Sequence, residues 1–315
     1  MKIAFVGKGG SGKTTLAGIF ARVLGQMGIP VLAVDADINQ HLLLALSGDT
    51  KITPPPPLGI EIDRIKKYLA GTNARIQKYT EMIKTTPPGK GSVLMRINEE
   101  NPLYEYFVKQ VGDIRFMATG GFTDEDLGVK CYHSKTGAVE LLLNHIVDST
   151  DEFMLVDMTA GADAFASGLF TRFDATFVVV EPTQKSLSVF LQYQKHAEPF
   201  GLAVYAIGNK VNDKDDEAYL YHHLGSSLVG IFQFSPFVRA QEKGVFSSIN
   251  ELEVPNRKTI ETLIALANSQ KKDWAKYQSD AVYFHKKNAE SWANAAMGID
   301  LANQIDPDFH YPPPL

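Results

Sequence analysis

A glycine-rich loop near the start of the chain limits the possible folds more than any other stretch. Residues 7–15 read Gly-Lys-Gly-Gly-Ser-Gly-Lys-Thr-Thr, directly after the apolar run 2–6 and before apolar residues at helical spacing over 16–24. A strand, a glycine loop and a helix in this order are typical of a phosphate-binding P-loop. The glycines let several backbone N–H groups point at one phosphate, and the positive end of the helix adds to the attraction.

The loop predicts a site for a nucleoside triphosphate with Mg²⁺. We expect Lys13 to reach the β- and γ-phosphates and the Thr14 hydroxyl to sit on Mg²⁺. Lys8 is not required for this binding, and a second cation in the loop can reach a nucleotide held by a facing subunit. The residues expected to contact the nucleotide here are Gly9, Gly10, Ser11, Gly12, Lys13, Thr14 and Thr15.

The composition excludes several other classes of protein. The 315 residues are 44% apolar and 21% charged, which is ordinary for a globular protein with a large core. A net charge of −5 gives no argument for binding nucleic acid or an anionic membrane, and no apolar run is long enough to span a bilayer. The single cysteine excludes an internal disulfide, and the chain enters its first strand without room for a signal peptide. We therefore expect a cytoplasmic protein.

Further apolar runs with strand character end in polar residues. They cover 30–35, 113–118, 153–157, 176–180, 203–207 and 227–232, with helix patterns between most of them. This alternation predicts an α/β fold with a mostly parallel sheet and helices on both faces. Because ligands bind at the carboxyl ends of parallel strands, Asp35 and Asp157 should lie beside the P-loop. Asp157 is expected to contact Mg²⁺ through water, and Gly161 to offer its N–H to the γ-phosphate.

Residues 8–14 resemble the deviant P-loop of the MinD/ParA/nitrogenase-iron-protein superclass of ATPases. The resemblance implies a nucleotide-sandwich homodimer in which Lys8 works across the interface. It also implies that Asp37 orients the attacking water and that Asp35 lies in the outer shell of Mg²⁺. The catalytic roles therefore fall to Lys8, Lys13 and Asp37, and the ligands are ATP or ADP with Mg²⁺. Relatives often have proline after the second aspartate, where this chain has Ile38.

The same resemblance assigns the base end of the nucleotide. In the superclass an Asn-Lys pair at the carboxyl end of a strand lies near the purine, and here the pair is Asn209-Lys210. Asn209 is the expected base contact, since its amide can pair with adenine edges, although asparagine is also common in turns. Relatives typically close over the base with a proline and an acidic residue after the last strand. This chain instead reads Gln-Phe-Ser-Pro-Phe over 233–237.

Residues 1 to about 250 also resemble the CooC-type ATPases, which support nickel insertion into carbon monoxide dehydrogenase. The shared features are Cys131-Tyr132-His133, the glycines at 120 and 121, the helix that follows and residues 157–161. CooC-type proteins carry Cys-x-Cys here, and two subunits pool four thiolates on one metal. With His133 in the second position, a dimer would offer two Cys and two His, a set suited to Zn²⁺ or Ni²⁺. A lone cysteine is also often a small buried hydrophobe. Both interpretations stay open.

Two segments exceed what a nucleotide-binding domain needs. Residues 50–110, with four prolines at 54–57 and one or two helices expected over 62–83, look like an insertion in an ATPase domain that covers 1–252. Residues 253–315 form a helical extension with an apolar stripe from Trp274 to Ile299. The stripe either packs on its own domain or forms a dimer or partner contact.

These features predict a dimeric molecular-switch ATPase that binds and hydrolyses Mg-ATP and assists the maturation of a metalloenzyme client, by metal insertion or a related step. The alternative is a ParA/MinD-like positioning ATPase, which predicts a basic DNA-binding surface or an amphipathic membrane tail. The acidic balance and the proline-ended carboxyl terminus disfavour both features, so we expect neither nucleic acid nor membrane as a partner.

Overall fold

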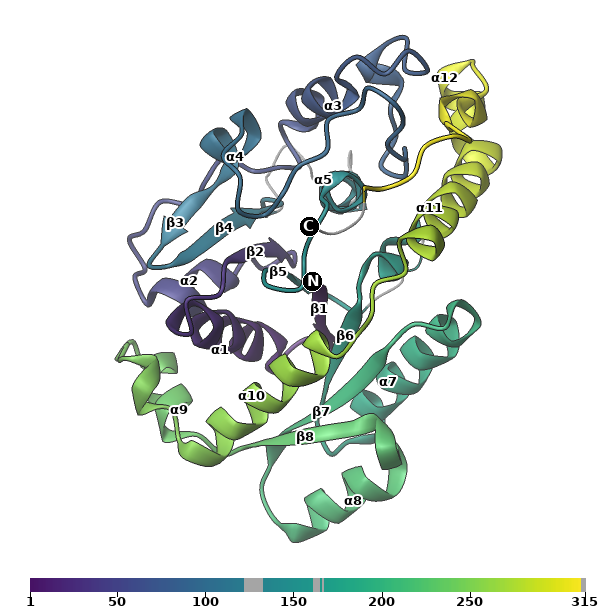
Figure 1. Cartoon of the computed structure of the whole chain (residues 1–315). Helices are drawn as coiled ribbons and strands as arrows, with labels where there is room; N and C mark the ends of the chain where they lie inside the picture. The colour runs from purple at the N-terminus through teal and green to yellow at the C-terminus, as the bar shows by residue number, and fades with distance from the viewer. Residues whose placement is uncertain (122–132, 161–164, 166, 313–315) are drawn as a thin grey trace.

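The centre of the molecule is a sheet with helices on both faces (Figure 1). The computed structural model describes residues 1–121, 133–160, 165 and 167–312, with the backbone alone at 133 and 134. Over these residues the sheet has eight strands in the order β3-β4-β2-β5-β1-β6-β7-β8, and the β3–β4 pair is antiparallel. The strands are β1 (Lys2–Gly7), β2 (Val31–Ala36), β3 (Lys109–Val111), β4 (Ile114–Ala118), β5 (Phe153–Met158), β6 (Ala175–Val180), β7 (Val204–Val211) and β8 (Leu228–Gln233).

The helices cover both faces of the sheet, because alternate residues of each central strand point to opposite sides. In β1, Ile3 and Phe5 pack with α1, α2, α9 and α10, whereas Ala4 and Val6 pack with the layer that contains α3, α4, α5, α7, α8 and α11. The helices are α1 (Lys13–Gln26), α2 (Leu42–Ser47), α3 (Ile62–Ala70), α4 (Pro102–Phe107), α5 (His133–His145), α7 (Gln184–Ala197), α8 (Lys214–Leu224), α9 (Pro236–Glu242), α10 (Val254–Asn268), α11 (Trp274–Asn288) and α12 (Asn294–Met297).

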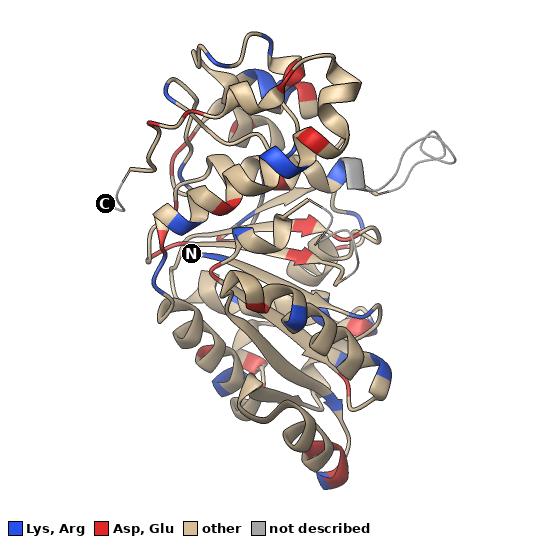
Figure 2. Cartoon of the chain, turned by 90° about the vertical axis from the view of Figure 1, so that its right-hand side faces the viewer, with Lys and Arg blue, Asp and Glu red and all other residues tan. Residues whose placement is uncertain are grey.

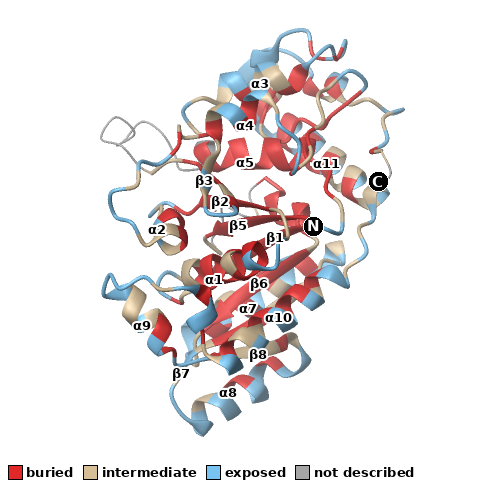
Figure 3. Ribbon diagram, turned by 60° about the vertical axis from the view of Figure 1, so that its left-hand side comes forward, coloured by how far each residue is buried: buried red, intermediate tan, exposed pale blue. Residues whose placement is uncertain are grey.

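Burial follows this layering, with buried strands and exposed outer helix faces (Figure 3). All six residues of β1, β2, β5 and β6 are buried, which explains why these strands read as continuous apolar runs in the sequence. The predicted α/β class with a mostly parallel sheet is confirmed. None of the helices in the described part of the chain combines the length and apolarity needed to cross a membrane.

The insertion differs from its prediction. Of the one or two helices expected over 62–83, one α-helix forms and ends at Ala70, because Gly71 takes a positive φ of 53° that leaves the helix; a single 3-10 turn follows at Tyr79–Glu81. The short elements α4 and β3 were not predicted. Each has six residues or fewer, too few for a clear period.

The insertion and the carboxyl-terminal extension are bound to each other. The His285 ring on α11 lies 3.3 Å from the Thr85 hydroxyl, Thr86 donates to Gln304 at 3.1 Å, and the Lys90 N–H donates to the Asp306 carboxylate at 2.8 Å. In the apolar stripe, Tyr277, Ala281 and Phe284 are buried, whereas Trp292 and Ile299 are exposed. Over 274–284 the stripe therefore packs on the chain itself.

At the amino edge of the sheet, the extension is anchored by a buried cluster of charges. Asp148 pairs with the amino group of Met1 at 2.9 Å, with Lys2 at 3.2 Å and with Lys272 at 2.5 Å. Lys272 also pairs with Asp174 at 3.0 Å, and none of these side chains is more than 9% exposed. The Lys2 ammonium donates further to the backbone oxygens of residues 143 and 146 and to a tyrosine hydroxyl on α11.

Candidate functional site

The P-loop lies in the middle of the sheet, after β1 and between the carboxyl ends of β5 and β6. The central strands carry little charge until these ends, where acidic residues lie in the strand tips (Figure 2). Asp35 and Asp157 occupy equivalent positions on the paired strands β2 and β5. The sheet therefore brings the predicted acidic residues to the loop, as expected at the carboxyl edge of a parallel sheet.

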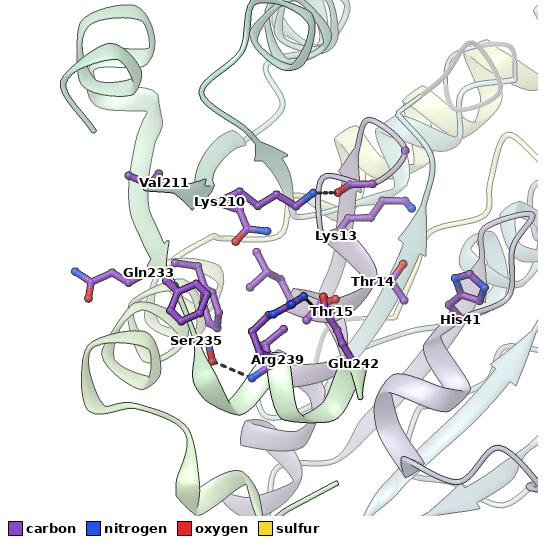
Figure 4. Close-up of a pocket in the computed structure, with 18 of the residues that line it drawn as sticks. Lys13, Thr14, Thr15, His41, Lys210, Val211, Gln233, Ser235, Arg239 and Glu242 are labelled. Atoms are coloured by element: carbon purple, nitrogen blue, oxygen red, sulfur yellow. Dashed lines mark hydrogen bonds and ion pairs between the residues drawn. The ribbon is translucent and has the colours of Figure 1, made fainter. Parts of the chain in front are cut away.

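The loop backbone depends on glycine and on two contacts from β7. Gly12 has a φ of 95°, and a Cβ at this position would stand 2.2 Å from the Asn209 amide nitrogen. That amide donates to the Ser11 carbonyl at 2.7 Å, and the Lys210 ammonium donates to the Gly10 carbonyl at 2.5 Å (Figure 4). In this structure the predicted base-binding pair thus holds the P-loop backbone in place.

Lys13 forms an ion pair with Asp37. Its Nζ lies 2.5 Å from the Asp37 carboxylate, and both side chains are buried, at 8% and 3% exposed. The other Asp37 oxygen accepts from the backbone N–H and side-chain amide of Asn39. Burial acts against the charged form of Asp37, but Lys13 and Asn39 outweigh it and hold the pKa of Asp37 below its ordinary value. Two residues that were predicted to be catalytic, Lys13 and Asp37, are therefore paired with each other in the nucleotide-free chain.

Asp35 and Asp157 lie deeper, side by side on paired strands. Burial raises the pKa of Asp35 to about 8, and the neighbouring Asp157 carboxylate adds to the rise. Burial also raises the pKa of Asp157 to about 6, while the Lys13 charge and the neighbouring Thr14 hydroxyl act in the opposite direction. Asp35 accepts hydrogen bonds from the backbone N–H groups of Asp37 and Leu42. Lys13 thus pairs with Asp37 and acts on Asp157, and Asp35 lies beside Asp157.

This donor set fits a hydrated Mg²⁺ held beside a nucleotide. Both carboxylate oxygens of Asp157 are buried without a hydrogen-bond partner among the described groups. Unpartnered buried oxygens are costly unless a ligand satisfies them. Mg²⁺ keeps several waters and takes few protein ligands. The Thr14 hydroxyl as a direct ligand, with the carboxylates of Asp35 and Asp157 in the outer shell, is therefore a suitable set.

A cavity of about 880 Å³ opens from the P-loop toward the end of β8. Its size is that of a small-molecule site. Figure 4 shows its lining, in which α1 and β7 face the start of α9. The segment 233–235, which departs from the pattern of relatives, forms part of the wall, and Arg239 pairs with Glu242 at 2.8 Å. The described lining includes Gly9, Gly10, Gly12, Lys13, Thr14, Thr15, Asp37, Asn209, Lys210, Phe232, Gln233, Phe234, Ser235, Arg239 and Glu242.

One acidic residue beside the loop escaped the sequence prediction. Glu181 directly follows β6 and pairs with Lys210 at 2.8 Å and with Lys8 at 3.9 Å. The rule that pointed to Asp35 and Asp157, a carboxylate at the carboxyl end of a buried strand, applies equally to Glu181. The signal was therefore present in the sequence.

Three predicted residues lie at or beyond the limit of what the structure describes. Gly161 and Cys131 fall outside the described residues, and at His133 the backbone alone is described, as the first residue of α5. Among the residues whose side chains are described, no group of three or more His, Cys, Asp or Glu is arranged to hold a metal ion by itself. The predicted interfacial Zn²⁺ or Ni²⁺ site stays a prediction.

One known family matches both the fold and the P-loop of this chain. The family described as the CobQ/CobB/MinD/ParA nucleotide binding domain matches residues 3–224. The chain belongs to this family. The match runs from β1 to the end of α8 and so includes the P-loop, all three aspartates and the Asn209-Lys210 pair. The resemblance predicted from residues 8–14 is confirmed.

Two similar proteins are matched over most of their length. An uncharacterized ATP-binding protein of Methanocaldococcus jannaschii is 29% identical over 246 residues, 77% of this chain and 88% of the relative. The carbon monoxide dehydrogenase accessory protein CooC of Rhodospirillum rubrum is 28% identical over 251 residues, 78% of this chain and 89% of the relative.

Solved structures share the fold of the family. A ParA family ATPase from Chlorobium tepidum has a TM-score of 0.56 at 18% identity and covers 85% of this chain and 98% of its own. The cell division ATPase MinD of Pyrococcus furiosus has a TM-score of 0.53 at 20% identity and covers 84% of this chain and 99% of its own. At these identities the likeness concerns the fold alone.

Proposed function

We propose that this chain is an ATPase that binds Mg-ATP, closes into a homodimer and hydrolyses ATP there. The observation that carries the proposal is the Lys13–Asp37 pair beside the buried carboxylates of Asp157 and Asp35, next to a cavity of nucleotide size. A binding lysine, a residue to position water and acidic partners for Mg²⁺ are the parts that phosphoryl transfer requires. The ATP-binding relative supports ATP as the nucleotide.

In this proposal the phosphates of ATP compete with Asp37 for Lys13. Once Lys13 turns to the β- and γ-phosphates, the Asp37 carboxylate is available to orient a water for in-line attack. Bound Mg²⁺ would neutralise charge on the β- and γ-oxygens, with Thr14, Asp35 and Asp157 holding it directly or through water. The loop backbone around Gly10 and Ser11, held by Lys210 and Asn209, offers its N–H groups to the phosphates.

The position of Lys8 supports the proposed dimer. Its side chain is 41% exposed, beside Glu181, and Lys8 is not one of the described residues that line the cavity of its own subunit. A cation in this position can neutralise charge on a nucleotide in a facing subunit, as an arginine finger does in trans. The two switch loops, after β2 and after β5, would relax once the γ-phosphate leaves.

Lys8→Ala tests this proposal. The variant should bind ATP within about twofold of wild type, since Lys13 is retained, but should lose about a hundredfold or more of its hydrolysis at dimer-forming concentrations. Nucleotide titration and phosphate release as a function of protein concentration measure the two effects. Lys13→Ala is the control that removes binding itself. Unchanged turnover in Lys8→Ala would exclude the action of Lys8 in trans.

We also propose that the ATPase serves a metalloenzyme, as the name of the similar CooC protein states for its own client. Cys131 and His133 from two subunits would then hold one Zn²⁺ or Ni²⁺ between them. Metal analysis of the purified protein with and without ATP should find one metal per dimer and none in Cys131→Ser. Equal metal content in the two proteins would remove this part of the proposal and leave the ATPase intact.

A further inference from the structure

A row of three charged side chains crosses the carboxyl ends of β1, β6 and β7. Lys8 follows β1, Glu181 follows β6 and Lys210 lies near the end of β7. Because β6 lies between β1 and β7 in the sheet, the Glu181 carboxylate has a lysine on each side. The three residues thus meet through strand order and not through nearness in sequence.

The two lysines are held to different degrees. Lys210 lies 2.8 Å from Glu181 and also donates to the Gly10 carbonyl, from a backbone position with a φ of 56°. Left-handed backbone is costly for a lysine, so the surrounding contacts must fix it. Lys8 lies 3.9 Å from Glu181 and keeps 41% of its side chain exposed. Glu181 therefore binds Lys210 closely and Lys8 loosely.

We propose that Glu181 is a positioning residue that retains Lys8 on its own subunit until a partner's nucleotide draws it away. This inference rests on the proposed function, in which Lys8 acts in trans. In the nucleotide-free chain the nearest recorded anion for Lys8 is Glu181, among the described side chains. On dimer closure the triphosphate of the partner offers a denser negative charge, and Lys8 exchanges one anion for the other.

The exposure of Lys8 limits the size of the effect. An ion pair this open to solvent changes an equilibrium by no more than about fivefold, and salt weakens it further. Such a weak contact suits a residue that must leave, since a buried pair would oppose closure. Lys210 keeps its bond to the Gly10 carbonyl when Glu181 loses its charge, so the P-loop should retain its shape.

The test measures dimer formation with a non-hydrolysable ATP analogue by sedimentation. Glu181→Gln keeps the shape and removes the charge, and we expect it to lower the protein concentration for half dimerisation about two- to fivefold. In the Lys8→Ala background the same substitution should change it less than twofold, which separates the Lys8 contact from a general change of charge. Glu261→Gln, an equal change of charge on α10 in a pair with Arg257, is the matched control and should have no effect.

A second measurement does not need the dimer. In the nucleotide-free chain, acetylation of Lys8 by a small reagent, mapped by mass spectrometry, should be at least about twofold faster in Glu181→Gln than in wild type or Glu261→Gln. At saturating protein the hydrolysis rate per subunit should be the same in Glu181→Gln and wild type, because Glu181 is not one of the described residues that line the cavity and the proposal gives it no role after Lys8 has left it.

The outcomes separate the two proposals. If wild type dimerises with the analogue but Glu181→Gln shows no shift, or shows the same shift in the Lys8→Ala background, the role of Glu181 is overturned and the ATPase dimer stands. If wild type stays monomeric, the proposed function fails, and the release of Lys8 fails with it. Equal acetylation of Lys8 in Glu181→Gln and wild type would contradict the contact in the resting chain.

Discussion

The two edges of the sheet both combine buried cations and carboxylates, but with opposite charges in excess. At the amino edge, three cations surround Asp148: the Met1 amino group, Lys2 and Lys272. In the cluster at the carboxyl edge there is one buried cation, Lys13, for three carboxylates: Lys13 pairs with Asp37 and acts on Asp157, and Asp35 lies beside Asp157. Both clusters are buried, so neither is screened by water to the extent of a surface pair.

The difference shows what each edge is for. Around Asp148 every cation listed above has a carboxylate or carbonyl partner, and the cluster joins β1, the start of β5 and the segment before α11. Around Lys13 the negative charges are in excess, and the Asp157 oxygens lack partners among the described groups. The first edge is complete without a ligand, whereas the second needs a cation and donors from elsewhere to reach balance.

The largest effect should come from breaking the amino-edge cluster. Asp148→Asn leaves the fully buried Lys2 without its carboxylate and should lower the free energy of unfolding by about 3–5 kcal/mol. Urea unfolding at pH 7 measures the loss. The conservative Glu152→Gln, four residues further on, keeps an acceptor for the backbone N–H of Ser149 and should cost less than about 1 kcal/mol. A loss below that in Asp148→Asn would show that the cluster is not what anchors the extension.

The corresponding change at the carboxyl edge should affect activity and spare stability. Asp37→Asn keeps the contact with Asn39 and relieves repulsion among the three carboxylates, which offsets the lost ion pair with Lys13. We expect the free energy of unfolding to change by less than about 1 kcal/mol. ATP hydrolysis, followed by phosphate release, should fall about a hundredfold or more. A loss of stability equal to that of Asp148→Asn would erase the contrast between the edges.

The smallest effect is a dependence on pH. The pKa of Asp157 is raised to about 6 and that of Asp35 to about 8, so the folded chain holds protons that the unfolded chain has released. The contribution of the protonated Asp35–Asp157 pair to the free energy of unfolding is therefore lost as the pH rises from about 4 to about 8. Asp157→Asn removes an unpartnered carboxylate and should make the nucleotide-free chain more stable than wild type by about 1–3 kcal/mol at pH 8, with a smaller gain at pH 5.

Thermal or urea unfolding at the two pH values measures this gain. The exposed Asp151→Asn is the matched control, and its difference from wild type should not vary with pH. If the gain from Asp157→Asn were the same at pH 5 and pH 8, the raised pKa values would not contribute to stability, and the excess of negative charge at the carboxyl edge would have no energetic consequence.

Much of this molecule could be predicted from the sequence, for physical reasons that differ by region. The central strands were found because burial on both faces requires apolar runs, and a polar residue marks the end of each run at the site. Asp35 and Asp157 followed from that rule, whereas the P-loop followed from its glycine motif and Asp37 from the family resemblance. The structure of the insertion could not be predicted, because its elements are short and it packs against the distant carboxyl-terminal tail, which local periodicity cannot reveal.

Side-chain pairing at the site was the part that sequence could not supply. Asn209 and Lys210 were predicted at the right strand end, but their bonds to the P-loop carbonyls depend on the order β1-β6-β7 and on the left-handed backbone of Lys210. The contact of Glu181 with two lysines depends on the same order. Strand order is a tertiary property, and no window of sequence contains it.

The bonds between the insertion and the tail also bear on how the chain is made. Thr85 and its partner His285 are 200 positions apart, and Thr86 and Gln304 are 218 positions apart. A ribosome that adds about 5–20 residues per second needs roughly 10–40 seconds to bridge such a gap. During that interval the nucleotide-binding core of the nascent chain can fold before the insertion has made its last contacts. The contacts between the insertion and the tail can form only after the final helices have been synthesised.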